Sequence, residues 1–304
     1  MKSLLQTKQW AALRQAQGWQ AHWIDDILIL EKSLPLGKSF LYSPEVSWEN
    51  LDTKYKKIYE YTKKIAENHH TIFLRLEILD VNDDKITSKL KQKGFIKAFE
   101  EIQPEWRQII DIARSEEEIL AQMKPKGRYN IRVAQKHGIK IETGKNEEII
   151  AIFYKLFCQT AERDGFEKRP KQYFVNLMQK LAPDGLAEIL IAKYNNIPVA
   201  AEIVTFYDGV ASYLYGASNN DYRNLMAPYL LHFEAIKRAK EKGCQVYDLL
   251  AVAPEGAERH KYAGITRFKE QFGGRKIHLV GSWDYVYKPG WYKIFKIAEK
   301  FRRK

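Results

Sequence analysis

The chain has 304 residues, 45% of them hydrophobic and 13% aromatic, with two isolated cysteines and a formal net charge of +12. This composition excludes a generally disordered chain and a disulfide scaffold, and the length suits two domains of about 100–200 residues each. The sequence has no run near the roughly 18 apolar residues of a membrane span, and its start is unlike a signal peptide. We therefore expect a soluble cytoplasmic protein. We expect no metal site, because no cysteine pair has zinc spacing.

The first third of the chain predicts alternating helices and strands. The expected elements are a helix over 4–16, strands over 19–24, 27–31 and 40–42, a helix over 51–68, a strand over 71–78, a helix over 83–93 and a strand over 95–102. The helix over 51–68 is the clearest, because Tyr55, Ile58, Tyr59 and Ile65 recur at about the 3.6-residue period of one buried face.

The remainder of the chain repeats this order. The expected elements are a strand over 109–113, helices over 116–123 and 129–137, a strand over 139–142, helices over 147–161 and 171–181, strands over 187–194, 197–207 and 210–215, a helix over 228–242, a strand over 246–252 and a helix that begins at Ile265. The turns Asn195-Asn196 and Asp208-Gly209 join the three central strands into a meander.

Each half therefore reads as helices, a three-stranded meander, a helix, a strand, a helix and a strand. That order is used by acyltransferases of the GNAT class. We expect an α+β fold of two tandem GNAT-like lobes, each a mixed, mostly antiparallel sheet flanked by helices. Lobe 1 comprises residues 1–105, joined by the C-terminal segment 282–304, and lobe 2 comprises residues 106–281.

The C-terminal segment after Pro289 predicts a basic amphipathic helix. The favoured interpretation is that Trp291, Ile294, Phe295 and Ala298 dock on the first lobe while the lysines face water. A membrane-surface role is the alternative.

Basic residues crowd into one short segment. They are Lys124, Lys126, Arg128, Arg132, Lys136 and Lys140. Arg128, Arg132 and Lys136 follow one another at a spacing of four, which puts like charges on one helix face at a small cost in stability. This arrangement indicates a polyanionic partner, such as tRNA, a nucleotide diphosphate or an anionic membrane surface, and among these we interpret Arg128, Arg132 and Lys136 as a patch for a tRNA backbone. A solvated helix face is the plainer explanation, and a basic chain favours solubility whatever its partner.

Several segments resemble one known family. They are IQPEWRQIIDI (102–112), MKPKGRYNIRVAQKHGIKIETG (123–144), TAERDGFEKRPKQYF (160–174), YLYGASNNDYRNLMAPYLLHFEAI (213–236) and CQVYDLLAVAPEGAERHKYAGITRFKEQFGG (244–274). In this order and spacing, they are similar to the Fem-type (FemABX) transferases that build the peptide bridges of bacterial peptidoglycan. Two features depart from the family. The segment YSPEVSW lacks the usual Arg-Gly or Lys-Gly pair, and the long helical-hairpin arm is absent, as in a short form.

The resemblance implies transfer of an amino acid from aminoacyl-tRNA to an amine on the stem peptide of a peptidoglycan precursor. The acceptor amine supplies the nucleophile, so we expect direct aminolysis with no covalent enzyme intermediate and no cofactor besides the tRNA co-substrate. The acceptor is a UDP-muramyl-pentapeptide or its lipid-linked form. We expect a monomer with possible peripheral contact with the inner membrane.

Anchors for the precursor are expected on two helices. Arg169 and Tyr173 lie four residues apart around Pro170, so they share a helix face and can address one ligand. The planar fork of an arginine suits a diphosphate, and by the resemblance this pair holds the muramyl-peptide precursor. Arg14 stands where the family has a basic residue for the precursor's phosphates. Without the resemblance, a surface arginine stacked on a neighbouring tyrosine is the favoured explanation of Arg169 and Tyr173, and Arg14 alone is a solvated helix charge.

The catalytic candidates lie near strand ends. Lys269 follows the strand over 246–252, and ligands gather at the carboxyl ends of strands in open sheets. By the resemblance its ammonium binds the oxyanion or the 3′-terminal phosphate of tRNA, and Phe268 packs against the terminal adenosine. Tyr215 precedes Gly216, where a ligand can approach the backbone, and Glu77 stands where the family has an Asp as amine acceptor or proton relay. The alternatives are a solvated lysine and a core tyrosine.

Two other function classes remain open. One is an acetyl-CoA-dependent GNAT N-acetyltransferase, which would cradle a pyrophosphate on a glycine-containing loop before a helix. The corresponding junction, residues 217–228, has no glycine, and a proline opens the helix. We therefore expect its backbone N–H groups to bind a pyrophosphate poorly. The other is a non-catalytic tRNA- or membrane-binding protein with the same fold.

Overall fold

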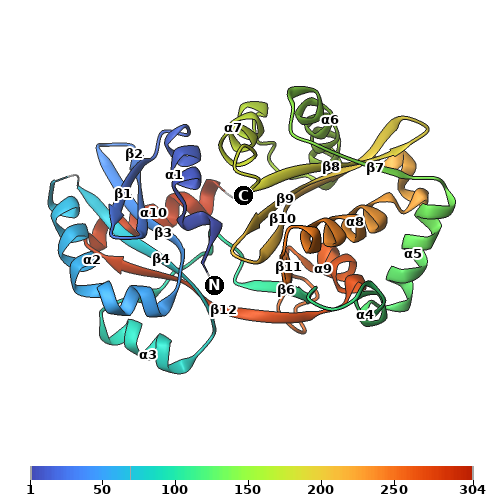
Figure 1. Ribbon diagram of the computed structural model, residues 1–304. Helices are drawn as coiled ribbons and strands as arrows, with labels where there is room; N and C mark the ends of the chain where they lie inside the picture. Colours follow the sequence, from blue (N-terminus) through green and yellow to red (C-terminus); the bar gives the residue numbers. More distant parts are fainter. Residues whose placement is uncertain (1, 69, 303–304) are drawn as a thin grey trace. The chain divides into compact units, whose positions relative to one another are not determined.

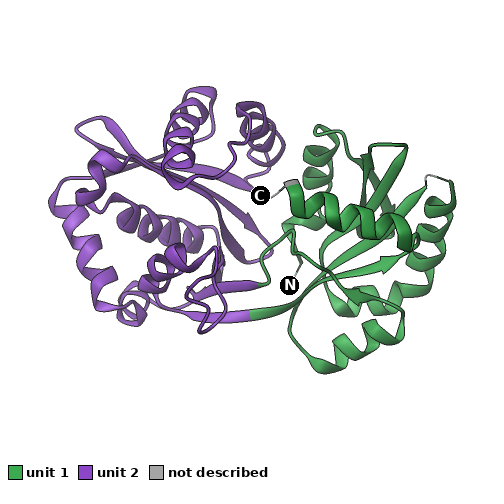
Figure 2. Cartoon of the chain, turned by 180° about the vertical axis from the view of Figure 1, so that it is seen from behind, with its two compact units in different colours: residues 1–105, 278–304 green, residues 106–277 purple. Residues whose placement is uncertain are grey.

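The computed structural model describes residues 2–68 and 70–302, which form two compact units (Figures 1 and 2). Unit 1 comprises residues 1–105 and 278–304, and unit 2 comprises residues 106–277. The second passage between units was expected at 281/282 but lies between 277 and 278, inside strand β12 (Arg275–Val286). The strand continues through this point without a turn or linker, so composition does not reveal the boundary.

Unit 1 is a sheet with helices on both faces. Its elements are η1 (Leu4–Gln6), α1 (Lys8–Gln15), β1 (Gln20–Ile24), β2 (Ile27–Leu34), β3 (Lys38–Val46), α2 (Trp48–Asn68), β4 (Thr71–Val81), α3 (Asp84–Gln92), β5 (Ile96–Lys97), the larger part of β12, and α10 (Pro289–Arg302). The strand order is β1-β2-β3-β4-β12, and β5 pairs with β12. Strands β3 and β4 run parallel and the other neighbours are antiparallel, as expected for a mixed sheet.

The two faces of this sheet differ in chemistry because side chains alternate along a strand. Leu74 and Leu76 of β4 belong to the apolar core that includes Ile58 of α2. On the same strand Phe73 contacts Phe295 of α10, so α10 covers the opposite face. That second face also carries charged side chains.

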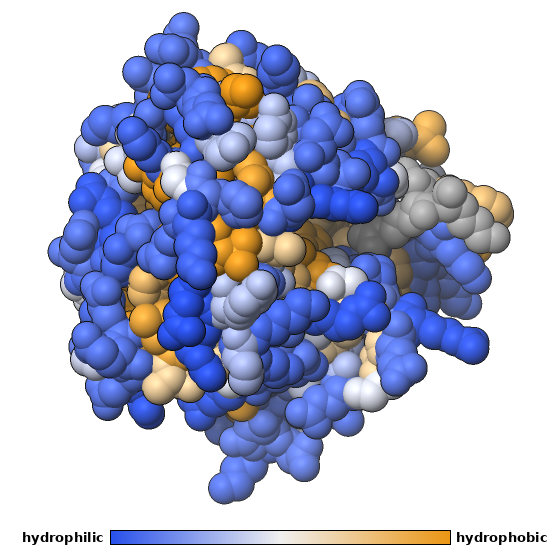
Figure 3. Space-filling model, turned by 90° about the vertical axis from the view of Figure 1, so that its right-hand side faces the viewer, coloured by the Kyte–Doolittle hydropathy of each residue, from blue (hydrophilic) through white to orange (hydrophobic). Residues whose placement is uncertain are grey.

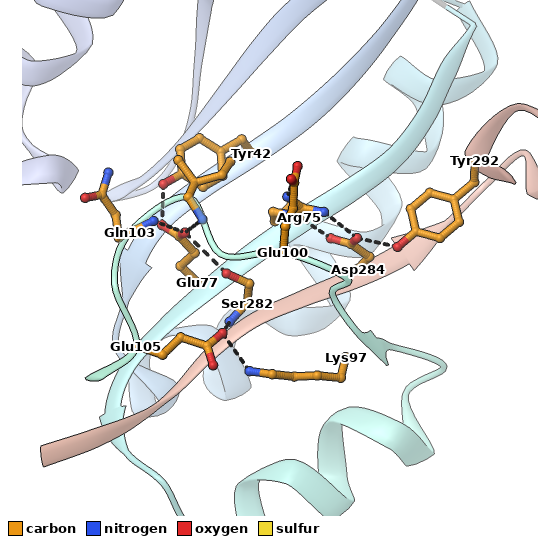
Figure 4. Close-up of polar contacts among 11 residues, drawn as sticks. Tyr42, Arg75, Glu77, Lys97, Glu100, Gln103, Glu105, Ser282, Asp284 and Tyr292 are labelled. Carbon is orange, nitrogen blue, oxygen red and sulfur yellow. Dashed lines mark hydrogen bonds and ion pairs between the residues drawn. The ribbon is translucent and has the colours of Figure 1, made fainter. Parts of the chain in front are cut away.

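A buried ion pair stabilises the charged face (Figure 4). Nε and Nη2 of Arg75 on β4 donate to the two carboxylate oxygens of Asp284 on β12 at 2.7 and 2.8 Å. The hydroxyl of Tyr292 on α10 donates to Asp284 Oδ2 at 2.6 Å, and Glu100 lies 3.5 Å from Arg75. These contacts tie the central strands to the C-terminal helix. The bidentate geometry supplies the specificity that a buried charge requires.

The strand expected over 95–102 is wrong beyond its first residues, since β5 covers Ile96–Lys97 alone. The backbone N–H groups of Ile102 and Gln103 donate to Glu77 Oε1 at 3.1 and 2.8 Å (Figure 4). A buried carboxylate has thus taken the donors that a strand ladder would use. No local sequence signal reveals such a competitor.

The C-terminal helix docks on unit 1 as expected, with Phe295 and the half-buried Trp291 among the contacting residues, but only half of the expected face is covered. Tyr292 is buried, and the ring of Phe295 packs against Phe40 and Phe73. Ile294 and Ala298, which were expected to dock, are exposed. In Figure 2 this helix runs across the near face of unit 1.

Unit 2 is a six-stranded sheet that also carries helices on both faces. Its elements are β6 (Trp106–Asp111), α4 (Glu116–Gln122), α5 (Pro125–Lys136), β7 (Lys140–Gly144), α6 (Glu147–Asp164), α7 (Lys171–Leu181), β8 (Ala187–Tyr194), β9 (Ile197–Tyr207), β10 (Val210–Ser218), η2 (Asn220–Leu225), α8 (Ala227–Glu241), β11 (Val246–Ala251), α9 (Ala263–Lys269) and η3 (Glu270–Phe272). The order is β6-β11-β10-β9-β8-β7, with β10 and β11 parallel and the other neighbours antiparallel.

The meander β8-β9-β10 is confirmed, with Asn195, Asn196 and Asp208 at positive φ in its turns. Helix α8 packs on one face of this meander, while α6 packs on the other with α7 against it (Figure 1). The helix expected to begin at Ile265 begins at Ala263.

We expect Asp284→Ala to lower the free energy of unfolding by roughly 3 kcal/mol, because it leaves the buried Arg75 guanidinium without its bidentate partner. Urea unfolding followed by circular dichroism measures the change. Asp26→Ala is the control, because it removes the exposed partner of Lys54 and should cost less than about 1 kcal/mol. Equal losses in the two variants would contradict the special weight given to the buried pair.

Candidate active site

The parallel strands β10 and β11 of unit 2 are hydrogen-bonded to each other over only part of their length. They pair from Val210 with Val246 to Ser212 with Asp248, although β10 continues to Ser218 and β11 to Ala251. A bulge follows Tyr213 on β10, and Leu250 on β11 has a φ of 55°. Backbone that leaves a ladder in this way offers a place for a ligand between the strands.

Lys269 lies where the two strands separate. It is 4% exposed, and its Nζ donates to the Ala251 carbonyl on β11 at 2.7 Å. The same Nζ is 5.6 Å from the ring centroid of Tyr213 on β10. Burial lowers the pKa of Lys269 to about 8, while the charge of Asp248 acts in the opposite direction. The ammonium is therefore charged at neutral pH but gives up its proton more readily than a surface lysine.

A buried polar cluster that the sequence did not suggest lies beside this lysine. His232 Nδ1 is 3.2 Å from Glu202 Oε2 and 3.2 Å from the hydroxyl of Tyr247, and its ring packs on Tyr213 at 4.4 Å between centroids. Burial raises the pKa of Glu202 and lowers that of His232 to about 3, with Lys269 adding to the latter effect. Burial therefore favours the uncharged form of both groups, which lie within hydrogen-bond distance of each other.

Two of these residues could not be found by local patterns. Glu202 sits in the hydrophobic strand β9 and His232 in the apolar stretch of α8, where single polar residues carry no spacing signal. Gly216 was expected to leave room for a ligand, but a Cβ there would lie 1.7 Å from the Tyr213 hydroxyl. The room beside Gly216 is taken by Tyr213 itself.

Tyr215, Tyr173 and Arg169 form a second group on the other face of the sheet. The Tyr215 hydroxyl donates to the Tyr173 hydroxyl at 2.9 Å, and the Arg169 guanidinium lies 4.8 Å from the ring centroid of Tyr173. Arg169 is exposed, whereas Phe174 and Phe157 pack against the Tyr215 ring. The structure therefore brings these three predicted residues together, and it presents a guanidinium above two phenols.

Phe268 lies within the core and not on the surface of α9. Its ring contacts those of Tyr229, His232 and Phe272, and Phe272 is fully buried, so both phenylalanines face the core. Part of Phe268 remains accessible.

Only part of the predicted basic patch on α5 is exposed to solvent. Arg128 is half-buried and its guanidinium donates to the Met123 carbonyl before the helix, whereas Arg132 and Lys136 are exposed. Figure 3 views the molecule from the side on which α5 lies in Figure 1 and shows mainly hydrophilic residues with narrower apolar areas between them.

Two predicted site residues lie in unit 1. The Arg14 guanidinium stacks on Trp19 at 4.3 Å from the ring centroid, and its Nη1 donates to Gln17 Oε1 at 2.7 Å. Glu77 is buried and accepts from the Tyr42 hydroxyl, from the backbone of residues 102 and 103, and from the Ser282 hydroxyl at 3.3 Å (Figure 4). All of these bonds join parts of unit 1, so Glu77 positions the segment that leads to the second unit.

The start of α8 bears on the question of a bound pyrophosphate. Met226 precedes the helix with a φ of 54°, Pro228 has no N–H, and the N–H of Tyr229 donates to the Met226 carbonyl at 3.0 Å. Two of the first three residues of the helix therefore offer no N–H to a ligand. An anion site built on a helix N-terminus needs those donors.

A profile of the FemAB family matches residues 83–196 and 184–300. The chain belongs to this family. The lipid II:glycine glycyltransferase of Staphylococcus epidermidis is 24% identical over 382 aligned positions, which cover 98% of this chain and 91% of that protein. The enzyme of the same name from Staphylococcus aureus is 23% identical, with 99% and 95% covered. The aligned length exceeds the 304 residues of this chain, so these relatives contain segments that it lacks.

Solved structures confirm the fold. The crystal structure of FemX superposes with a TM-score of 0.85 at 22% identity, covering 96% of this chain and 94% of that chain. A tandem GNAT protein from the clavulanic acid biosynthesis pathway gives a TM-score of 0.53 at 12% identity, with 85% and 78% covered. The FemAB chain is thus built of two GNAT-like lobes.

The described residues limit two other possibilities. Within 2–68 and 70–302, no cluster of three or more His, Cys, Asp and Glu side chains could hold a metal ion. None of the helices in these ranges has the length and apolar character needed to cross a bilayer.

Glu77 should make the stability of unit 1 depend on pH. Burial raises its pKa from 4.5 to about 7, partly offset by hydrogen bonds from Tyr42 and Gln103. The folded state therefore binds this proton more tightly than the unfolded state. The associated stability is present below pH 4.5 and is lost as the pH rises through about 7.

We expect Glu77→Gln, which stays neutral, to remove this contribution, on the order of 3 kcal/mol across that window. Urea unfolding of variant and parent at several pH values measures it, and Glu60→Gln, at an exposed position, should follow the parent. A parallel pH dependence in Glu77→Gln and the parent would exclude the assigned titration.

Proposed function

We propose that this FemAB protein is an aminoacyltransferase that acts in the cytoplasm. It moves an amino acid from aminoacyl-tRNA to an amine of the stem peptide of a peptidoglycan precursor, forming part of an interpeptide bridge in cell wall biogenesis. The carrying observation is Lys269, a buried ammonium at the point where β10 and β11 separate, in a chain related along its length to named glycyltransferases. Those names make glycine and a lipid-linked acceptor the first choices for the two substrates.

The reaction is direct aminolysis of an ester. The acceptor nitrogen attacks the aminoacyl carbonyl carbon, the C–N bond forms, and the carbonyl oxygen becomes an oxyanion. Collapse of this intermediate breaks the bond to the ribose oxygen, which takes up the proton that the amine loses. The step needs no covalent enzyme intermediate and no further cofactor.

Lys269 suits the stabilisation of the oxyanion. An ammonium has three N–H donors, and Ala251 accepts one of them, so the others can address a ligand oxygen. Because the group is nearly dry, its interaction with a developing negative charge is stronger than in water. The bond to Ala251 also fixes the side chain before substrate arrives, which reduces reorganisation in the transition state.

Arg169, Tyr173 and Tyr215 suit recognition of the precursor. The exposed guanidinium of Arg169 can pair with the diphosphate. The ring of Tyr173, whose hydroxyl accepts a hydrogen bond from Tyr215, packs against this guanidinium and orients it. In this proposal Arg14 binds a phosphate of the precursor, and the partly accessible Phe268 packs against the terminal adenosine. The exposed Arg132 and Lys136, with the partly engaged Arg128, contact the tRNA backbone.

An acetyl-CoA-dependent reaction is less well supported. The first turn of α8 lacks the donors that a pyrophosphate requires there. Release of free CoA thiol, set against deacylation of charged tRNA, discriminates the two reactions directly.

We expect Lys269→Met to lower kcat by about 10²-fold or more, since the substitution keeps the stem and removes the oxyanion donor. The assay incubates the protein with mixed charged tRNAs and lipid-linked or UDP-linked muramyl-pentapeptide and follows the acceptor by mass spectrometry. Lys155→Met, on the exposed side of α6, is the matched control and should behave as the parent. Unchanged turnover in Lys269→Met would remove the central element of the proposal.

The parent should also lose kcat as the pH rises above about 8, because a pKa near that value leaves the lysine uncharged on the alkaline side. Lys269→Arg, whose guanidinium stays protonated, should move this limb to higher pH. If kcat falls at the same alkaline pH in the parent and in Lys269→Arg, a group other than Lys269 causes the fall.

We expect the second group to separate into binding and turnover effects. Arg169→Ala should mainly raise KM for the precursor, since an exposed cation contributes binding and not chemistry. Tyr215→Phe removes the hydroxyl that bonds Tyr173 and should lower kcat by about tenfold with its ring packing intact. Full activity of both variants would place precursor recognition elsewhere.

A further inference from the structure

Helix α10 has two apolar faces, and only one of them is covered. Tyr292 and Phe295 pack on unit 1, as described above. On the opposite side Ile294, Ile297 and Phe301 are 55%, 58% and 71% exposed. Their spacing of three and four residues puts them in one stripe along the helix, with the exposed Ala298 at its edge. We call Ile294, Ile297, Ala298 and Phe301 the outer stripe.

The outer stripe is unusual for a surface helix. Scattered apolar residues on a protein surface are common, but consecutive large side chains along one helix face mark a contact surface. The inner face alone suffices to dock the helix, through the ring contacts of Phe295 and the bond from Tyr292 to Asp284. The outer stripe therefore has no packing role inside this unit.

Positive charge borders the outer stripe. Lys293 and Lys300 are exposed and lie seven residues apart, so they follow the same edge of the helix. Lys296 is half-buried with its ammonium 5.3 Å from the Tyr292 ring centroid, on the side toward unit 1. Apolar residues bordered by lysines are the pattern of helices that lie in a bilayer interface.

A neighbouring turn adds a second apolar element. Leu36, between β2 and β3, is 79% exposed. Two residues later the Lys38 ammonium lies 4.7 Å from the ring centroid of Trp291, in the first turn of α10. The turn thus stands next to the start of the helix, and it repeats the combination of an exposed leucine with a lysine.

We propose that the outer stripe of α10, together with the turn at Leu36, is a docking surface for an anionic lipid bilayer. The apolar side chains enter the acyl boundary, and Lys38, Lys293 and Lys300 meet lipid phosphates. The net charge of +12 favours approach to such a surface. A second copy of this chain fits less well, because pairing two stripes would bring their lysines together.

This surface concerns attachment and not chemistry. It gives a protein that acts on a lipid-linked acceptor a way to remain beside its substrate, and this benefit rests on the proposed function. Binding to lipid itself needs neither tRNA nor acceptor, so the two ideas can fail separately.

The experiment measures co-sedimentation of the full chain with vesicles of phosphatidylethanolamine and phosphatidylglycerol, and with vesicles of phosphatidylcholine alone. The test variant combines Ile297→Asn with Phe301→Asn. The matched control is Ile197→Asn, at a residue of unit 2 that is 45% exposed. A charge pair compares Lys293→Glu and Lys300→Glu together with Lys91→Glu, at an exposed lysine of α3.

We expect the parent and both controls to bind anionic vesicles and to bind neutral ones weakly. The double asparagine variant should lose on the order of tenfold in partitioning, and the double glutamate variant a similar amount. Thermal unfolding should be unchanged, since the altered side chains are exposed, and transfer to a water-soluble UDP-linked acceptor should persist.

Three results would overturn the inference. One is vesicle binding by the asparagine variant equal to that of the parent. Another is binding by the parent that ignores lipid charge or does not occur. The third is a dimer of the parent in sedimentation that the asparagine substitutions dissociate, which would assign the outer stripe to a second copy.

Discussion

The separation of β10 from β11 after three paired residues is the constraint on which the candidate site depends. Parallel neighbours normally continue their ladder, and unpaired backbone inside a fold is costly. Here side chains contact the two strands where they separate. The Lys269 ammonium donates to the Ala251 carbonyl on β11 and lies near the ring of Tyr213 on β10. A charge can be kept there because a carbonyl, an aromatic face and the field of Asp248 replace part of its hydration.

The two units share a mixed sheet with one pair of parallel strands, but the two parallel pairs differ in how far their hydrogen bonding extends. In unit 1 the equivalent parallel pair, β3 with β4, remains in register from Ser39 with Thr71 to Val46 with Ile78, apart from local bulges. Its charged face is filled by Arg75, Glu77 and Asp284 with their partners. The early end of pairing between parallel neighbours is thus a feature of β10 and β11 in unit 2.

Buried polar groups recur in both units, but their chemistry differs. In unit 1 they are a bidentate ion pair and a carboxyl that accepts four hydrogen bonds, arrangements that fix strands, a helix and a connecting segment. In unit 2 burial favours the uncharged forms of Glu202 and His232, and Glu202 Oε1 has no hydrogen-bond partner among the residues described. The cluster supports Tyr213, so the geometry around Lys269 depends on groups that do not touch it.

The sequence by itself determined the elements whose signals are local: the amphipathic period of α2, the turns of the meander, and the family motifs that pointed to Lys269, Tyr215, Tyr173 and Arg169. Only the tertiary structure decided which groups meet. It turned residues 98–102 from the expected strand into part of a segment bonded to Glu77, left Ile294 out of the docked face of α10, and placed Glu202 beside His232. Periodicity reports which side of an element is apolar, whereas partners far apart in the chain are set by sheet register and packing, which no local pattern encodes.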